Sequence, residues 1–74
     1  MCIASLKSMT LALKAKKALS KENIFSEVVK LEPNMTQKGC AYGIQFDCFQ
    51  LNHSLDVLNA NRIKYTEIIN DLSR

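Results

Sequence analysis

The spacing of apolar residues changes along the chain, and each change predicts a new element. Short apolar or alternating runs at 2–6, 24–31, 41–46 and 63–69 are typical of β-strands. Between the first two runs, apolar residues recur every three or four positions, as on one face of a helix, and this spacing returns from 47 to 61. The predicted order of elements is therefore β-α-β-β-α-β.

Polar residues at the ends of the two periodic segments support this assignment. Ser8 or Thr10 can cap the first helix, and Asn23 is suited to the left-handed position at its end. Asp47, with Gln50 three residues later, is typical of the start of the second helix, which we expect to end at Asn61. The predicted core faces comprise Leu11, Ala12, Ala15, Ala18 and Leu19 on the first helix and Cys48, Leu51, Leu55 and Leu58 on the second. We interpret Lys14, Lys17 and Lys21 as a solvated face, 32–39 as a loop and 70–74 as a frayed tail.

Two crossovers around a central hairpin predict one α+β domain over residues 1–74. We expect a ferredoxin-like plait, in which a four-stranded antiparallel sheet carries both helices on one face. In this topology the loop before the third strand lies at the same end of the sheet as the start of the first helix.

Composition narrows the function classes. The net charge of +3 is mild and does not indicate nucleic-acid binding. No segment is long enough for a signal peptide or a membrane span, and three cysteines do not form a disulfide framework, so we expect a reduced, cytoplasmic protein. The chain has one histidine, His53, and no Cys-x-x-Cys pair, so we expect neither a metal site nor a cofactor.

The candidate chemistry lies in residues 38–43 (KGCAYG), where a loop is expected to become a strand. The thiol of Cys40 stands between Gly39 and Gly43 and close to Lys38, a position we expect to be exposed and electropositive. The start of the first helix, near Ser8, would also favour a thiolate at this end of the sheet. The alternative is that Cys40 is simply a small residue at the start of a strand.

The other two cysteines fall at the opposite end of the predicted sheet. Cys48 is separated from Cys40 by a mostly extended segment, which puts it beyond the reach of a disulfide with Cys40. A bond between Cys2 and Cys48 is geometrically conceivable, because their strands should be neighbours. We interpret both as packing residues, since Cys48 lies on an apolar helix face and Cys2 begins a buried strand.

The pattern resembles the putative selenium/sulfur carrier protein-like family of small bacterial and archaeal proteins. The resemblance extends over about Ile3 to Ile69 and rests on Ser8 at the start of the first helix, the Ala-x-x-Ala stretch from Ala12, and the small and apolar residues after Cys40. Leu6 departs from the family pattern, in which an aromatic residue is common.

The resemblance implies that Cys40 carries sulfur or selenium as a persulfide or selenosulfide between a donor and an acceptor protein. Lys38 would support the anion electrostatically, Gly39 and Gly43 would let a partner's backbone approach, and the helix start at Ser8 would contribute to binding. A carrier of this kind docks on its partners and is not a turnover enzyme.

Two other function classes compete with this interpretation. RNA-recognition motifs share the fold and have a third-strand signature that residues 38–42 follow, except that Cys40 replaces an aromatic residue and the first strand has none, which disfavours RNA binding. A non-catalytic regulatory or assembly module is the stronger alternative, with a homodimer through an exposed edge strand left open.

Overall fold

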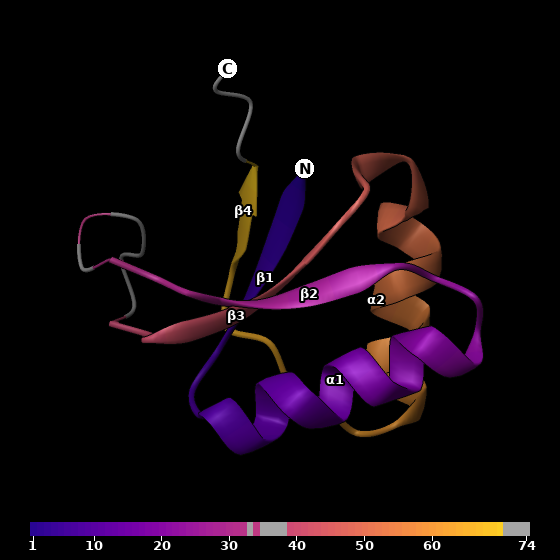
Figure 1. Ribbon diagram of the computed structural model, residues 1–74, viewed down its shortest axis with the longest axis horizontal. Coiled ribbons are helices and arrows are strands. Elements are labelled where there is room, and N and C mark those ends of the chain that lie inside the picture. The colour runs from indigo at the N-terminus through magenta and orange to yellow at the C-terminus, as the bar shows by residue number, and fades with distance from the viewer. Residues whose placement is uncertain (33, 35–38, 71–74) are drawn as a thin grey trace.

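The computed structural model describes residues 1–32, 34 and 39–70 (Figure 1). The elements in chain order are β1 (Cys2–Leu6), α1 (Met9–Lys21), β2 (Ser26–Lys30), β3 (Tyr42–Phe46), the 3₁₀ helix η2 (Cys48–Gln50), α2 (Leu51–Ala60) and β4 (Ile68–Asn70). The described strands form a four-stranded sheet in the order β2-β3-β1-β4. Every neighbouring pair is antiparallel, which confirms the predicted α+β, ferredoxin-like plait.

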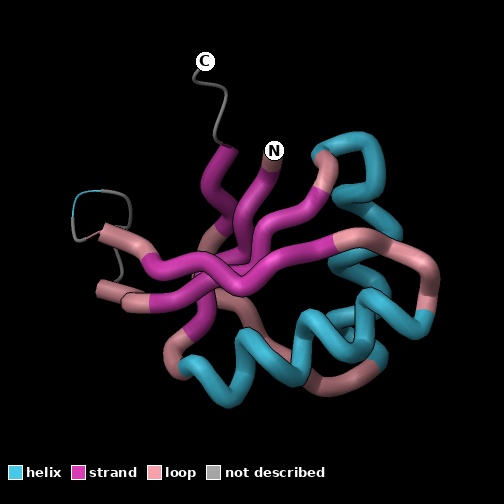
Figure 2. The backbone as a smooth tube through the Cα atoms, in the orientation of Figure 1, coloured by secondary structure: helices cyan, strands magenta, loops and turns pink. Residues whose placement is uncertain are grey.

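The two faces of the sheet differ because side chains alternate along each strand. Ala4 and Leu6 of β1 pack in one buried cluster with Ala15 of α1 and Leu58 of α2, so both helices cover this face (Figure 2). Ile3, which precedes Ala4 and points to the other side of the strand, belongs to a second, smaller cluster on the helix-free face. The predicted core residues of both helices pack in the first cluster, and Lys14, Lys17 and Lys21 are exposed as expected.

α1 begins and ends with the caps that its sequence predicts. Ser8 is the N-cap, and its Oγ accepts a hydrogen bond from the Leu11 N–H at 3.2 Å. Asn23 takes a left-handed conformation with φ 61°, and the Ile24 N–H then donates to the Leu19 carbonyl at 2.9 Å. Since Ile24 closes this helix end, β2 begins at Ser26, and the predicted strand start at 24 is wrong.

The same motif ends α2 and corrects the last predicted strand. Arg62 has φ 58°, and the Ile63 N–H donates to the Leu58 carbonyl at 2.9 Å. Ile63 is fully buried in the helix-side core, so its apolar character serves the helix end. β4 therefore begins only at Ile68, and the predicted strand over 63–69 is wrong in its first half. Residues 71–74 of the predicted tail lie outside the described residues.

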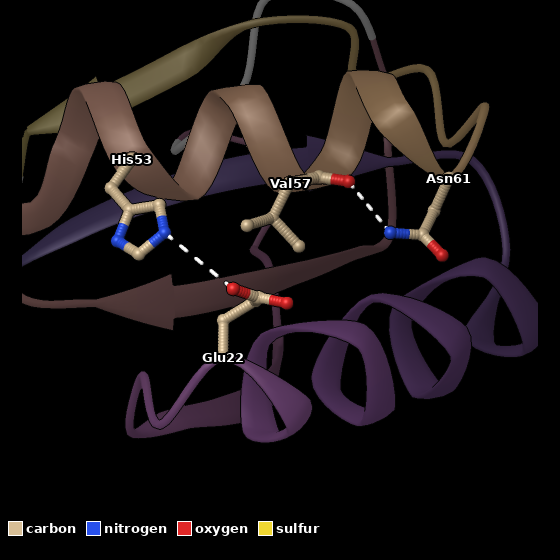
Figure 3. Close-up of polar contacts among 4 residues, drawn as sticks. All are labelled: Glu22, His53, Val57 and Asn61. Carbon is tan, nitrogen blue, oxygen red and sulfur yellow. Dashed lines mark hydrogen bonds and ion pairs between the residues drawn. The ribbon is translucent and has the colours of Figure 1, made fainter.

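Asp47 caps the second helical segment, as predicted. Its Oδ1 accepts a hydrogen bond from the Phe49 N–H at 2.9 Å, and the chain passes through η2 before α2 begins. Figure 3 shows two contacts made by α2: His53 Nε2 lies 3.9 Å from Glu22 Oε1 at the end of α1, and the side chain of Asn61 donates to the Val57 carbonyl. No helix in the described ranges has the length and apolarity to cross a membrane.

A disulfide bond joins Cys2 to Cys48. β1 and β3 are adjacent, Cys2 is paired with Phe46, and η2 turns the chain back two residues later, which leaves the two Cα atoms 5.1 Å apart. Both cysteines do pack in the helix-side core, as interpreted, but the expectation that they are reduced is wrong. The bond can form because β1 and β3 are adjacent in the sheet, as the predicted topology requires.

Candidate functional site

Cys40 is the one cysteine with a free thiol, and it lies just before β3. Gly39, with φ 75°, turns the chain immediately ahead of it. Only 5% of the residue is exposed, so the expectation of an exposed thiol is wrong. The reason is that Cys40 packs with Ile3 and Leu31 against the sheet.

Among the described residues, Cys40 packs with apolar side chains and has one polar contact. It forms a buried cluster with Ile3 of β1 and Leu31, which follows β2, on the face of the sheet that the helices leave free. The polar neighbour is Thr66, whose Oγ1 lies 3.2 Å from Cys40 Sγ and accepts its hydrogen bond. The thiol thus has a hydroxyl partner inside an apolar pocket.

A buried serine holds Thr66 in position. The Thr66 N–H donates to the Ser5 carbonyl at 2.8 Å, and the Ser5 N–H donates to the Glu67 carbonyl at 2.9 Å. Ser5 Oγ, fully buried, donates to the same Glu67 carbonyl at 3.2 Å and accepts from the Glu67 N–H at 3.0 Å. These bonds fix the segment ahead of β4 against β1, so the hydroxyl of Thr66 is presented to Cys40 by backbone pairing.

Sequence reasoning missed Thr66. It is 26 residues from Cys40 and was expected inside a strand, with nothing to distinguish it from any other threonine. The signal that could have found it is topological: in the predicted plait the last strand lies beside the first, which brings this segment to the end of the sheet where Cys40 enters.

Gly43 shapes the pocket around Cys40. A Cβ atom at this position in β3 would lie 2.7 Å from Ile3 Cγ2, 3.1 Å from the Ala4 carbonyl oxygen and 3.5 Å from Leu31 Cδ1. Those two side chains are the ones that cover Cys40. The absent side chain therefore lets Ile3 and Leu31 close over the strand, and Gly43 shares its neighbours with the candidate nucleophile.

The remaining predicted site residues are less closely associated with the thiol. A Cβ built on Gly39 would meet nothing within 4 Å, so there is open space beside Gly39 itself. The hydroxyl of Ser8 is engaged by the Leu11 N–H as the helix cap. Lys38 lies outside the described residues. No group of three metal-binding side chains is found among residues 1–32, 34 and 39–70.

This arrangement can support chemistry at one sulfur atom. A hydroxyl can accept a hydrogen bond from a thiol or donate one to a thiolate, so the Thr66 hydroxyl can bond to Cys40 in either form. A family model described as "Putative Se/S carrier protein-like" matches residues 1–70. The chain belongs to this family. No curated protein and no solved structure matches the chain, so for this Se/S carrier-like protein the family and the geometry around Cys40 carry the functional argument.

Proposed function

We propose that this Se/S carrier-like protein holds sulfur or selenium on Cys40, as a persulfide or selenosulfide, and passes it between proteins of sulfur or selenium metabolism. The proposal rests on the difference between the three cysteines: two are bonded to each other and one is free. The bonded pair is Cys2 and Cys48, and Cys40 has the free thiol.

The transfer step balances without an oxidant. The Cys40 thiolate attacks the terminal sulfur or selenium atom of a donor persulfide or selenosulfide, forming a new bond from Cys40 Sγ to that atom. The bond between this atom and the donor's own sulfur breaks, and the donor leaves as a thiolate. Transfer to an acceptor is the same exchange with the acceptor thiolate as the attacking group.

A carrier must first hold its sulfur or selenium atom and then deliver it, and the surroundings of Cys40 bear on both steps. Burial beside Ile3 and Leu31 shields the loaded sulfur from other nucleophiles, and Thr66 can donate a hydrogen bond to the charged sulfur. Delivery requires that the segment around Cys40 open locally, since a 5% exposed residue is inaccessible to a partner's thiolate. The open space beside Gly39 gives the partner a route of approach. The predicted electrostatic support from Lys38 belongs to the same proposal.

Loading with glutathione persulfide, followed by peptide mass spectrometry, tests the proposal. We expect one added sulfur atom on the Cys40 peptide and none in Cys40→Ser, and the disulfide-bonded peptides of Cys2 and Cys48 serve as the internal control that stays unloaded. Loading that persists in Cys40→Ser, or that is absent from the folded wild-type protein, would contradict it. The selenium analogue of the donor, used in competition, decides which element is preferred.

Thr66→Val and Thr66→Ser refine this test. Removing the hydroxyl should slow loading about fivefold, equivalent to one hydrogen bond of about 1 kcal/mol, and serine should restore the rate. Equal rates in all three proteins, with unchanged circular dichroism, would mean that Thr66 only fills space.

The RNA-binding alternative gains no support from the aromatic residue of its signature. Tyr42 packs against the helix-side core and therefore does not lie on the open face, where bases stack in RNA-recognition motifs.

A further inference from the structure

β2 lies at the edge of the described sheet, so its outer backbone groups have no neighbouring strand among the described residues. The Leu31 N–H donates to the Ala41 carbonyl toward β3, and the register continues from this pair along β2. Because alternate residues of an antiparallel strand bond to the same neighbour, Glu27 and Val29 also bond to β3. The N–H and C=O groups of the alternate residues, Ser26, Val28 and Lys30, therefore point away from the sheet.

A groove lined by both apolar and polar side chains, Lys16 and Glu27 among them, lies beside this edge between α1 and β2. Its volume is about 330 Å³, and its lining includes Leu13, Phe25 and Ser26. Phe25 is 70% exposed and Leu13 is 54% exposed, a high exposure for large apolar side chains on one surface. Ser26, by contrast, is 4% exposed, and its Oγ has no hydrogen-bond partner among the described residues.

We propose that a second copy of this chain covers the β2 edge. The two β2 strands would pair antiparallel across a twofold axis at Val28, so that two four-stranded sheets become one continuous sheet. Val28 is the middle residue of β2 (Ser26–Lys30), and this register therefore pairs the whole strand with its copy. About six new hydrogen bonds would use all the outward backbone groups.

The side chains favour the same register. Centred on Val28, Ser26 lies opposite the second copy's Lys30, so this register sets no like charges directly opposite each other. A register centred on Glu27 would instead set two carboxylates directly opposite each other, which is destabilising, and would pair only part of the strand. The Val28 register also places the exposed ring of Phe25 opposite the second copy's Leu31.

The opposite edge of the sheet is a weaker candidate. β4 has three residues, against five in β2, and offers a shorter ladder. The inference concerns assembly and does not depend on Cys40 chemistry, so failure of sulfur loading leaves it intact.

Sedimentation equilibrium and amide hydrogen exchange, both over a concentration series, test the proposal. We expect a reversible dimer, with exchange at the amides of Ser26, Val28 and Lys30 slowing as concentration rises. Phe25→Ser should weaken association at least tenfold. Phe49→Ser is the matched control, since Phe49 is 98% exposed and lies in η2, away from the edge.

Three results would overturn the proposal: a monomer up to millimolar concentration, concentration-dependent protection at β4 and not at β2, or equal weakening by the two phenylalanine variants. Circular dichroism of each variant confirms folding, and the exchange measurement on the wild-type chain needs no variant.

Discussion

Breaking the bond between Cys2 and Cys48 should remove about a third or more of the unfolding free energy of this domain, by the estimates below. The bond closes a loop with a sequence separation of 46 residues. In the chain-entropy treatment, a loop of that length restricts the unfolded chain by about 4 kcal/mol at 25 °C. A domain of this size has a total unfolding free energy of about 4–11 kcal/mol. At the lower end of this range, we expect the reduced protein to be close to the limit of folding.

Urea unfolding with and without a reductant measures the effect. With an m-value of about 1 kcal/mol/M for a small domain, the midpoint should fall by about 3–4 M on reduction. The Cys2→Ala/Cys48→Ala variant should match the reduced wild type and should not respond to reductant. Cys40→Ser is the control for the free thiol, and it should respond to reductant as the wild type does.

One result would refute the reasoning. If alkylation and mass spectrometry show that the bond is fully reduced, yet the midpoint moves by less than about 0.5 M, the loop does not limit the unfolded chain as the entropy treatment requires.

Three further changes test the packing, the caps and the surface by the same urea assay. Gly43→Ala should lower the free energy of unfolding by about 1–3 kcal/mol, because the added methyl overlaps Ile3 Cγ2. An unchanged midpoint would mean that the Ile3 side chain moves aside without cost. Ser8→Ala should cost about 1 kcal/mol through the lost N-cap bond to α1, and no loss would refute the capping role. Glu22→Gln should change stability by less than about 0.5 kcal/mol, because its contact with His53 is 3.9 Å long and about half exposed; a larger loss would show a strong ion pair.

Element order and core were predictable because they depend on local spacing. The alternation in 41–46 and the helical recurrence of Ala12, Ala15 and Leu19 reflect which side chains leave water, and the structure buries these three helix residues fully. The cap residues Ser8 and Asp47 were predictable for the same local reason, since each satisfies backbone groups within three residues of itself.

Strand boundaries were harder because an apolar residue after a helix can serve either element. Ile24 and Ile63 were assigned to strands from their β-branched side chains, but each closes the helix before it. In both places a non-glycine residue, Asn23 or Arg62, takes the left-handed conformation. Asparagine signals that conformation in sequence and arginine does not, so the left-handed residue could be predicted only at the end of α1, although Asn61 was correctly expected to end α2.

Part of the candidate site could likewise be predicted from the sequence, and part depends on tertiary packing. A lone cysteine beside glycines could be found in the sequence, but its burial and its contact with Thr66 depend on how a non-strand segment packs across the sheet. Gly43 was interpreted as room for a partner, and the structure adds a nearer reason for a glycine, which is room for Ile3.

The placement of the three cysteines bears on how a carrier avoids discharging itself. A free thiol near a loaded Cys40 would attack its inner sulfur, form a disulfide and release the cargo. β3 separates Cys40 from Cys48, and its five extended residues alone span about 16 Å, well beyond the Cα separation of about 7 Å that a disulfide tolerates. Cys2, the register partner of Phe46, lies at the same far end of the sheet as Cys48. Under the proposed function, neither cysteine could therefore resolve a persulfide on Cys40 within the folded chain, even when their own bond is reduced, and discharge would require a thiol from a partner protein.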